Sequence, residues 1–332
     1  MENNSINQTT NNMETMSNNQ TTNNMENNSN NQTYNNKETM SNNQKTNNME
    51  TKSHNSKQFS SAHPGLISFI IDQSGSMSEA YPEGGTKANF TYLVVNRAIN
   101  EMINANGDGE TVKDRVFLSL IGCGTPVKEI RTDKLSDFAN NPLRIESGTQ
   151  KMSDGNGGLL DVAVQRPIYF EPMADGLTPL AATLDVVKQV FGSFMEKNPN
   201  SPAPVAIILS DGMPRSKDTE DSVEEANAIA KAQEIMALEC ADGHPLIFNC
   251  HIGSGNNKCE FPATEDELPD EQAKFLFKIS SEVPDSYRDA ARKLELDLPE
   301  HAKGMVSNAD PTTFIKFVNF GSSAANQDKM SN

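Results

Sequence analysis

Residues 65–76 read GLISFIIDQSGS, and this stretch decides the fold. Residues 66–71 form a short apolar run that begins after a glycine and ends at Asp72. Such a run is typical of a strand that is covered on both faces by other elements. The polar residues from Asp72 to Ser76 then follow the carboxyl end of the strand, where open parallel sheets bind their ligands. The stretch therefore predicts both the fold class and the place of a functional site.

Similar patterns recur along the chain. Three more apolar runs predict buried strands at residues 116–121 (VFLSLI), 205–209 (VAIIL) and 246–252 (LIFNCHI). Apolar residues at helical spacing predict helices at residues 90–103, 180–195 and 222–239. This alternation predicts an α/β fold of Rossmann-like architecture, with a mainly parallel central sheet and helices on both faces. Residues 161–170 are expected to add an antiparallel strand.

The N-terminal region differs in composition. A 12-residue pattern repeats four times through Asn48, as MENNSINQTTNN, METMSNNQTTNN, MENNSNNQTYNN and KETMSNNQKTNN. A tract so rich in Asn, Thr, Gln and Ser cannot bury enough apolar surface to fold, although Asn- and Gln-driven self-association is an alternative. We therefore predict a disordered tail over residues 1–62, one domain over 65–321 and a flexible C-terminal tail over 322–332.

Charge and cysteine content limit the partners and the compartment. The chain has 28 basic and 45 acidic residues, a net charge of -17, which repels nucleic acid and anionic membranes. No stretch approaches the roughly 20 apolar residues that cross a bilayer, and the N-terminus does not resemble a signal peptide. The four cysteines are too few for a disulfide scaffold in a chain of 332 residues. We therefore expect a cytoplasmic protein with reduced thiols.

Three loops at the predicted sheet edge carry hard oxygen donors. The candidate metal ligands are Asp72, Ser74, Ser76, Thr178 and Asp211. A set without His or Cys suits Mg²⁺ or Mn²⁺ and disfavours zinc. Two carboxylates nearly balance a dication, and coordination positions remain for water or for a carboxylate of a partner. Gly75 and Gly212 are expected to allow the tight turns that point these side chains inward.

The sequence DQSGS, together with Thr178 and the later SDG, resembles the metal-ion-dependent adhesion site of von Willebrand factor A (vWA) domains. That site has the pattern DxSxS, a Thr in the second loop and an Asp in the third. Over residues 65–321 the chain is similar to bacterial vWA proteins of the tellurium-resistance type, including the segments CHIGSG, EFPATEDELPDEQAKFLFKISSEVP and AKGMVSNADPTTFIKFVNFG.

The resemblance implies that Ser74, Ser76 and Thr178 coordinate the metal directly, and that Asp72 and Asp211 do so directly or through water. The second loop reads Gly-Leu-Thr-Pro where the family commonly has Gly-Gly-Thr-Pro, so Leu177 is expected to alter how Thr178 is presented.

These observations predict a binding function. We expect a divalent-metal-dependent protein–protein interaction module, not an enzyme, in which an Asp or Glu of the partner completes the coordination. The resemblance implies an intracellular scaffold or regulator in a stress-response or phospho-signalling system, with a phosphatase or kinase as partner. One alternative is a metal-dependent hydrolase or phosphatase, although Lys87 and Arg215 are the only basic residues near the motifs. The other is a surface adhesin, which requires export.

Other motifs carry less weight. Cys240, His244, Cys250, His251 and Cys259 invite a zinc interpretation, but their spacing fits no zinc pattern, so we expect buried thiols and a polar His. Residues 104–109 open like an EF-hand loop, but Arg115 stands where a bidentate Glu is required, so a helix-ending turn is expected. Residues 82–87 lack the P-loop spacing and are expected at the rim of the metal site.

Overall fold

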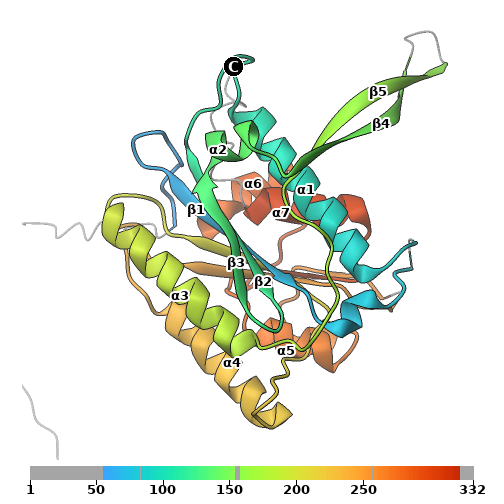
Figure 1. Ribbon diagram of the computed structural model, residues 1–332. Helices are drawn as coiled ribbons and strands as arrows, with labels where there is room; N and C mark the ends of the chain where they lie inside the picture. Colours follow the sequence, from blue (N-terminus) through green and yellow to red (C-terminus); the bar gives the residue numbers. More distant parts are fainter. Residues whose placement is uncertain (1–54, 83, 154–157, 256, 322–332) are drawn as a thin grey trace, which may run out of the picture. The chain divides into compact units, whose positions relative to one another are not determined.

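The computed structural model describes residues 55–82, 84–153, 158–255 and 257–321 (Figure 1). A seven-stranded sheet has the order β3-β2-β1-β6-β7-β9-β8. Its strands are β1 (Gly65–Asp72), β2 (Val116–Cys123), β3 (Lys128–Lys134), β6 (Val205–Ser210), β7 (Leu246–His251), β8 (Cys259–Glu260) and β9 (Met305–Ser307). The five inner strands are parallel, and β3 and β8 are antiparallel edge strands. The predicted α/β fold with a mainly parallel sheet is confirmed.

Helices cover both faces of this sheet. One face packs against α1 (Lys87–Asn106), α2 (Leu135–Asn140), α6 (Arg288–Lys293) and α7 (Pro311–Gly321). The other face packs against α3 (Leu180–Lys197), α4 (Asp221–Met236) and α5 (Glu271–Lys278). Three short 3-10 helices, η1 (Gly75–Ser78), η2 (Glu265–Glu267) and η3 (Asp285–Tyr287), lie in the connections. Within the described residues, no helix has the length and apolar character needed to span a membrane.

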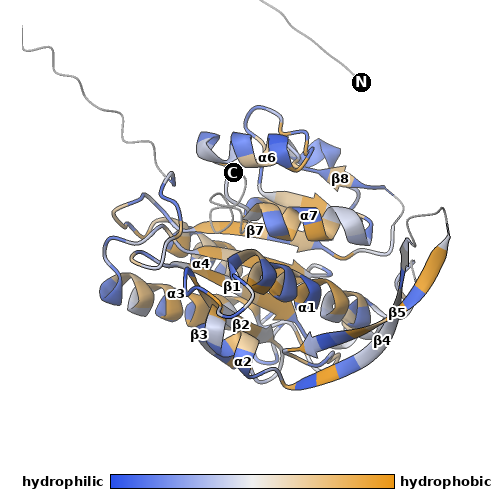
Figure 2. Ribbon diagram, turned by 90° about the horizontal axis from the view of Figure 1, so that it is seen from above, coloured by the Kyte–Doolittle hydropathy of each residue, from blue (hydrophilic) through white to orange (hydrophobic). Residues whose placement is uncertain are grey.

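The alternation of side chains along β1 explains its continuous apolar sequence. Ile67, Phe69 and Ile71 point to the face of α1 and α7, and Leu66 and Ile70 point to the face of α3 and α4. Because successive residues of a strand point to opposite faces, a strand covered on both sides is apolar at most positions, and in β1 only Ser68 interrupts the apolar run from Leu66 to Ile71. The strands of the central sheet are accordingly coloured mainly as hydrophobic in Figure 2.

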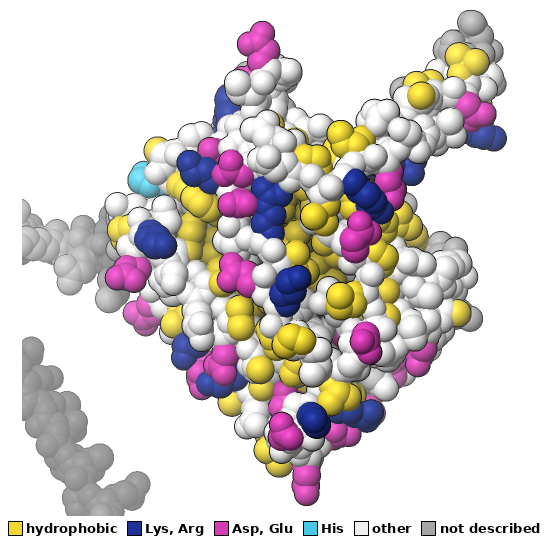
Figure 3. All heavy atoms as spheres, viewed as in Figure 1, with side chains coloured by type: hydrophobic (Ala, Val, Ile, Leu, Met, Phe, Trp, Pro, Cys, Tyr) yellow, Lys and Arg dark blue, Asp and Glu magenta, His cyan; other side chains and the backbone are white. Residues whose placement is uncertain are grey.

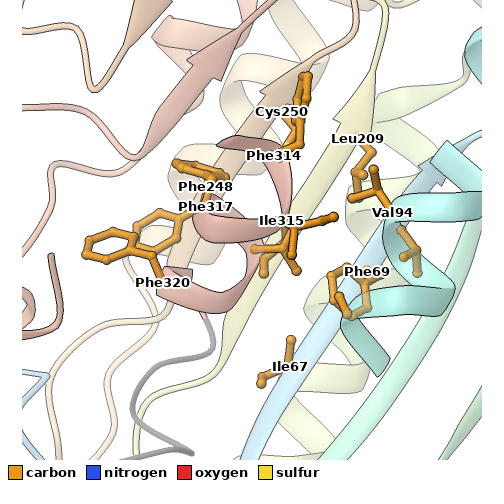
Figure 4. Close-up of a cluster of buried hydrophobic side chains, with 14 of the residues drawn as sticks. Ile67, Phe69, Val94, Leu209, Phe248, Cys250, Phe314, Ile315, Phe317 and Phe320 are labelled. Atoms are coloured by element: carbon orange, nitrogen blue, oxygen red, sulfur yellow. The ribbon is translucent and has the colours of Figure 1, made fainter. Parts of the chain in front are cut away.

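The face of α7 carries an aromatic core (Figure 4). Phe248 on β7 is fully buried, and its ring stacks on Phe320 with 6.0 Å between ring centroids and 18° between ring planes. Phe317 lies on α7 with Phe320, and its ring centroid is 6.1 Å from that of Phe248. This packing fixes the position of β7 against α7, and therefore the carboxyl end of the sheet.

The predicted helices are confirmed, with shifted ends. The helix expected from 90 to 103 runs over Lys87–Asn106, because Thr86 caps its first turn by accepting a hydrogen bond from the Asn89 N–H. The helix expected to end at 239 ends at Met236. The edge strand β3 reads KEIRTDK and has no buried residue, so it lacks the apolar pattern from which the inner strands were predicted.

A long hairpin stands apart from the central sheet. Its strands β4 (Arg144–Ser153) and β5 (Leu159–Ile168) form a separate two-stranded antiparallel sheet that projects from the body in Figure 1. The antiparallel strand expected at 161–170 is therefore present as β5, but it pairs with β4 and not with the central sheet.

The chain already packs on the domain before Gly65. The backbone N–H groups of Ser56 and Lys57 both donate to Asp242 Oδ1 at 3.0 Å, and Phe59 is buried in the core. One aromatic side chain and one carboxylate thus hold residues 55–62, which the composition had assigned to the tail. The rest of the predicted N-terminal tail and the predicted C-terminal tail lie outside the described residues.

Candidate metal centre

The candidate site lies where the strand order changes direction. From β1 the sheet continues through β2 on one side and through β6 on the other. Asp72 is the last residue of β1, and Asp211 follows the end of β6. In open α/β sheets the crevice at such a switch point is the usual ligand site. The fold therefore places both predicted carboxylates at the edge expected for binding.

Three of the predicted oxygen donors lie side by side. The hydroxyl oxygens of Ser74 and Ser76 are 3.0 Å apart, and the Ser76 hydroxyl donates to Asp211 Oδ1 at 2.9 Å. Neighbouring ligands of an octahedral Mg²⁺ ion, with bonds of about 2.1 Å, are about 3 Å apart. The spacing of these atoms thus fits adjacent ligand positions around one octahedral Mg²⁺ ion. Together with Thr178, they line an open pocket of about 280 Å³.

Asp72 lies behind these donors. Its side chain is buried, with Oδ1 accepting from the Ser74 N–H at 2.9 Å and Oδ2 accepting from the Ser210 hydroxyl at 2.6 Å. Burial raises the pKa of Asp72 to about 6, the Ser210 hydrogen bond opposes this shift, and the nearby Asp211 carboxylate adds to it. Because both oxygens are engaged within the protein, this geometry fits contact with a metal through water better than direct coordination.

Thr178 reaches the same pocket through a fixed backbone. Its carbonyl accepts hydrogen bonds from the Arg215 and Leu180 N–H groups, both at 2.8 Å, and its side chain is buried. The N–H of the preceding Leu177 donates to the Thr125 hydroxyl at 3.3 Å. A leucine is thus accommodated before Thr178 while the threonine remains at the pocket wall.

The two glycines in these loops differ. Gly212 has a φ of +135°, and a Cβ there would lie 2.4 Å from Gln272 Cβ, so glycine is required for the turn and for the close approach. Gly75 does not have a positive φ, and a Cβ there would meet no atom closer than 3.6 Å. The expectation that Gly75 supplies conformational freedom is therefore wrong; its N–H donates to the Gly176 carbonyl at 3.0 Å.

Lys87 enters the site more deeply than the sequence indicated. Its ammonium lies 2.9 Å from Asp211 Oδ2 and 2.7 Å from Glu79 Oε2, and the side chain is buried. Burial alone would lower the pKa of Lys87, but the bonds to Glu79 and Asp211 outweigh it and raise the pKa. A sequence signal existed, since a lysine in the first turn of a helix opposes the helix dipole unless an acidic partner compensates it.

The carboxylates of the site outnumber its ammonium group. Asp72, Asp211 and Glu79 carry three negative charges when ionised and Lys87 carries one positive charge, which leaves -2. One divalent cation neutralises this sum, whereas a monovalent ion does not. The donor chemistry and the charge thus both fit Mg²⁺ or Mn²⁺.

The other candidate motifs do not assemble into metal sites. In the part of the chain that the structure describes, no group of three or more His, Cys, Asp or Glu side chains is arranged to hold a metal ion. Cys240, His244, Cys250, His251 and Cys259 are therefore not brought together as a metal-binding group. Cys250 is buried, as expected, and burial raises the pKa of its thiol, whereas Cys240 and Cys259 are only half-buried. Asp108 accepts hydrogen bonds from the Glu110 and Thr111 N–H groups, which confirms a turn after α1.

One trio has the order of a catalytic triad, with His251 and Ser307 buried and Asp270 half-buried. His251 Nδ1 lies 2.7 Å from the Ser307 hydroxyl, and its Nε2 lies 3.8 Å from Asp270 Oδ1. Ser307 is completely buried in β9, so a substrate could reach its hydroxyl only if the sheet rearranged. The hydrogen bond between His251 and Ser307 instead connects β7 and β9 beside the candidate metal centre.

Comparisons with known proteins find only distant similarity. No family model and no curated protein matches the chain. Among solved structures it is similar to the PilB minor pilin from Streptococcus sanguinis, at 11% identity and a TM-score of 0.43, over 81% of this chain and 63% of that one. It is also similar to proximal thread matrix protein 1 from the mussel byssus, at 12% identity and a TM-score of 0.37, over 77% and 47% of the two chains.

A third similar structure is the vWF domain of the type V pili tip protein Mfa5 from Porphyromonas gingivalis, at 13% identity and a TM-score of 0.27. The match covers 48% of this chain and 43% of that one. The chain thus spans less than two thirds of each of these three proteins. These values describe a distant likeness of fold, and no function follows from them.

Proposed function

We propose that this protein is a binding module that recognises an acidic side chain of a protein partner through a divalent cation at the β1–β6 edge. The observation that carries the proposal is the spacing of about 3 Å between the oxygens of Ser74, Ser76 and Asp211 in an open pocket. Bound there, Mg²⁺ or Mn²⁺ supplies a coordination position for a carboxylate of the partner. Thr178 adds a neutral donor, and Asp72 orients the Ser74 loop.

The rim of the pocket suits a protein surface. Met213 is more than one third exposed at the pocket and offers an apolar contact. Arg215 pairs with Asp221 at 3.1 Å, but both side chains are largely exposed, so the pair is weak and can exchange for an acidic group of a partner. An apolar contact and a cation around a metal site favour an acidic peptide segment.

Binding is favoured over catalysis by the state of the carboxylates. Among the described residues that line the pocket there is no histidine. Glu79 and Asp211 are both paired with Lys87, which leaves neither as a free general base. We therefore propose a scaffold and not a hydrolase. Mg²⁺-dependent turnover of a phosphate ester by the pure protein would contradict this choice.

The cellular setting is proposed from the sequence resemblance alone. Similarity to vWA proteins of the tellurium-resistance type supports a cytoplasmic scaffold in a stress response, with a phosphatase or kinase as partner. The alternative is an exported adhesin that uses the same metal site. Cell fractionation distinguishes them, because the scaffold remains with the cytoplasm and the adhesin is recovered at the surface.

The central experiment is capture of partners from lysate of the protein's own cells, with Mg²⁺ and with EDTA. We expect a partner to be retained in Mg²⁺, and to be lost with EDTA or when Asp211→Ala is the bait. Asp218→Ala is the matched control, since it removes one exposed carboxylate on the loop after β6, outside the pocket. Retention that is the same with Asp211→Ala and with EDTA would refute metal-dependent binding.

A further inference from the structure

The Lys87 ammonium occupies one side of the candidate metal centre. Asp211 uses Oδ1 to accept from Ser76 and Oδ2 to pair with Lys87, so both of its oxygens are engaged without a metal. Lys87 and Asp211 are both buried, and a buried pair is little screened by solvent. The carboxylate that a dication needs is therefore already neutralised by a cation of the protein itself.

Glu79 gives this ammonium a second partner that is independent of Asp211. Residues 80 and 86 form an isolated antiparallel bridge, and the Lys87 N–H donates to the Glu79 carbonyl at 3.0 Å. The loop between them is closed further by a hydrogen bond from the Tyr81 N–H to the Gly85 carbonyl. The backbone therefore holds Glu79 beside Lys87 whether or not Asp211 is engaged.

We propose that Lys87 is a tethered counter-ion of Asp211 that a divalent cation must displace, and that Glu79 keeps the displaced ammonium paired. This inference rests on the proposed metal-binding function. It makes metal binding an exchange of one cation for another, which lowers the affinity of the free protein for metal. A carboxylate of the partner then adds the coordination that favours the exchange, so metal and partner bind more tightly together than separately.

The test is calorimetric titration of MnCl₂ into the purified full chain. Lys87→Met removes the ammonium but keeps most of the apolar stem, and we expect it to raise the Mn²⁺ affinity about tenfold or more, since a nearby like charge no longer opposes the ion. Glu79→Gln leaves the ammonium with Asp211 as its remaining carboxylate, so we expect the affinity to fall several-fold. Lys258→Met is the control, because it removes a lysine that pairs with Asp310.

The Mn²⁺ affinity is expected to rise in Lys87→Met and to fall in Glu79→Gln. Structural damage would instead weaken Mn²⁺ binding in both variants. Thermal unfolding gives a second readout: the Lys87→Met protein unfolds at a lower temperature in EDTA, and Mn²⁺ raises that temperature more than it does for the wild type.

If the wild type binds Mn²⁺ and Lys87→Met binds it equally or less well, the counter-ion inference is overturned while the proposed function stands. If neither protein binds Mn²⁺, both fail. If Lys87→Met does not fold, the result with Glu79→Gln decides: weaker binding supports the inference, and equal or tighter binding overturns it.

Discussion

The candidate metal centre and the β4–β5 hairpin depart from the usual distribution of polar and apolar residues in opposite directions. The centre buries charged groups, with Asp72 2% exposed and Lys87 5% exposed. The hairpin exposes apolar groups, with Leu159 67% exposed and Leu160 58% exposed, and apolar atoms are visible on its projecting end in Figure 3. Buried charges and clustered exposed apolar groups are the departures that carry information about function.

The two regions differ in whether their unusual side chains have partners within the described residues. Each buried charge at the centre has a partner of opposite charge or a hydrogen bond, so the site is organised before any ligand binds. On the hairpin, the register places Leu160, Val162 and Val164 on one face of β5, where Leu160 and Val162 are exposed and Val164 is half-buried. Among the described residues, its base is tied to α1 by hydrogen bonds from the Tyr92 hydroxyl to Glu146 at 3.0 Å and from the Asn100 amide to the Pro167 carbonyl at 3.1 Å. A two-stranded ribbon is marginally stable in water.

The largest effect on stability is expected in the core, where apolar side chains are buried as usual. Phe248→Ala removes a fully buried ring that packs against Tyr287, Phe317 and Phe320. We expect the free energy of unfolding to fall by about 3–5 kcal/mol, because the core loses apolar contact and gains a cavity. Urea denaturation followed by circular dichroism measures it. A loss below about 1 kcal/mol would mean that the aromatic core relaxes to fill the space.

At the centre, Asp211→Ala is expected to act on metal binding. It removes the carboxylate that contacts both Ser76 and Lys87, and we expect Mn²⁺ affinity to fall about 100-fold or more, equivalent to about 2.7 kcal/mol. Titration calorimetry checks this, with Leu160→Ser on the hairpin as a variant whose affinity should remain that of the wild type. An affinity within threefold of the wild type would place the metal elsewhere.

A smaller effect is expected from a surface charge at the start of α7. Asp310 accepts from the Thr312 and Thr313 N–H groups and pairs with Lys258 at 3.0 Å. The Lys258 ammonium, followed by the Thr313 hydrogen bonds, lowers the pKa of Asp310 to about 2. The folded pKa is below the unfolded value, so this contribution is complete above about pH 4 and is lost as the pH falls toward 2.

Asp310→Ala tests that contribution. We expect it to cost about 1 kcal/mol at neutral pH, as for other helix caps, and less at pH 2, where the wild type has lost part of the benefit. Thermal unfolding at both values measures the difference. An equal cost at both values would mean that the carboxylate charge is not what stabilises the helix.

The strands of the central sheet were predicted well from the sequence and the β4–β5 hairpin poorly, for a physical reason. The central strands are apolar at successive positions because both faces are buried, and that pattern is visible in one segment. β4 reads RIESGTQKMS, which has no continuous apolar run, because its pairing with β5 is not enforced by burial.

The same limit applies within the metal centre. The five predicted ligands follow or precede elements whose positions in the sheet could be inferred, so their approach to one edge was predictable. The contact between Lys87 and Asp211 joins residues 124 positions apart and depends on the angle at which α1 enters, which no local pattern encodes.

The smallest effect is expected on the hairpin, and it tests whether its apolar face is uncovered. Combining Leu160→Ser with Val162→Thr should change the free energy of unfolding by no more than about 0.5 kcal/mol, because solvated side chains lose little when they become polar. Ile168→Thr is the matched control on the same face of β5, where the side chain is buried at the base, and it should cost about 1–3 kcal/mol. Urea denaturation compares the proteins; a double variant as damaging as the control would mean that another part of the chain covers the outer hairpin.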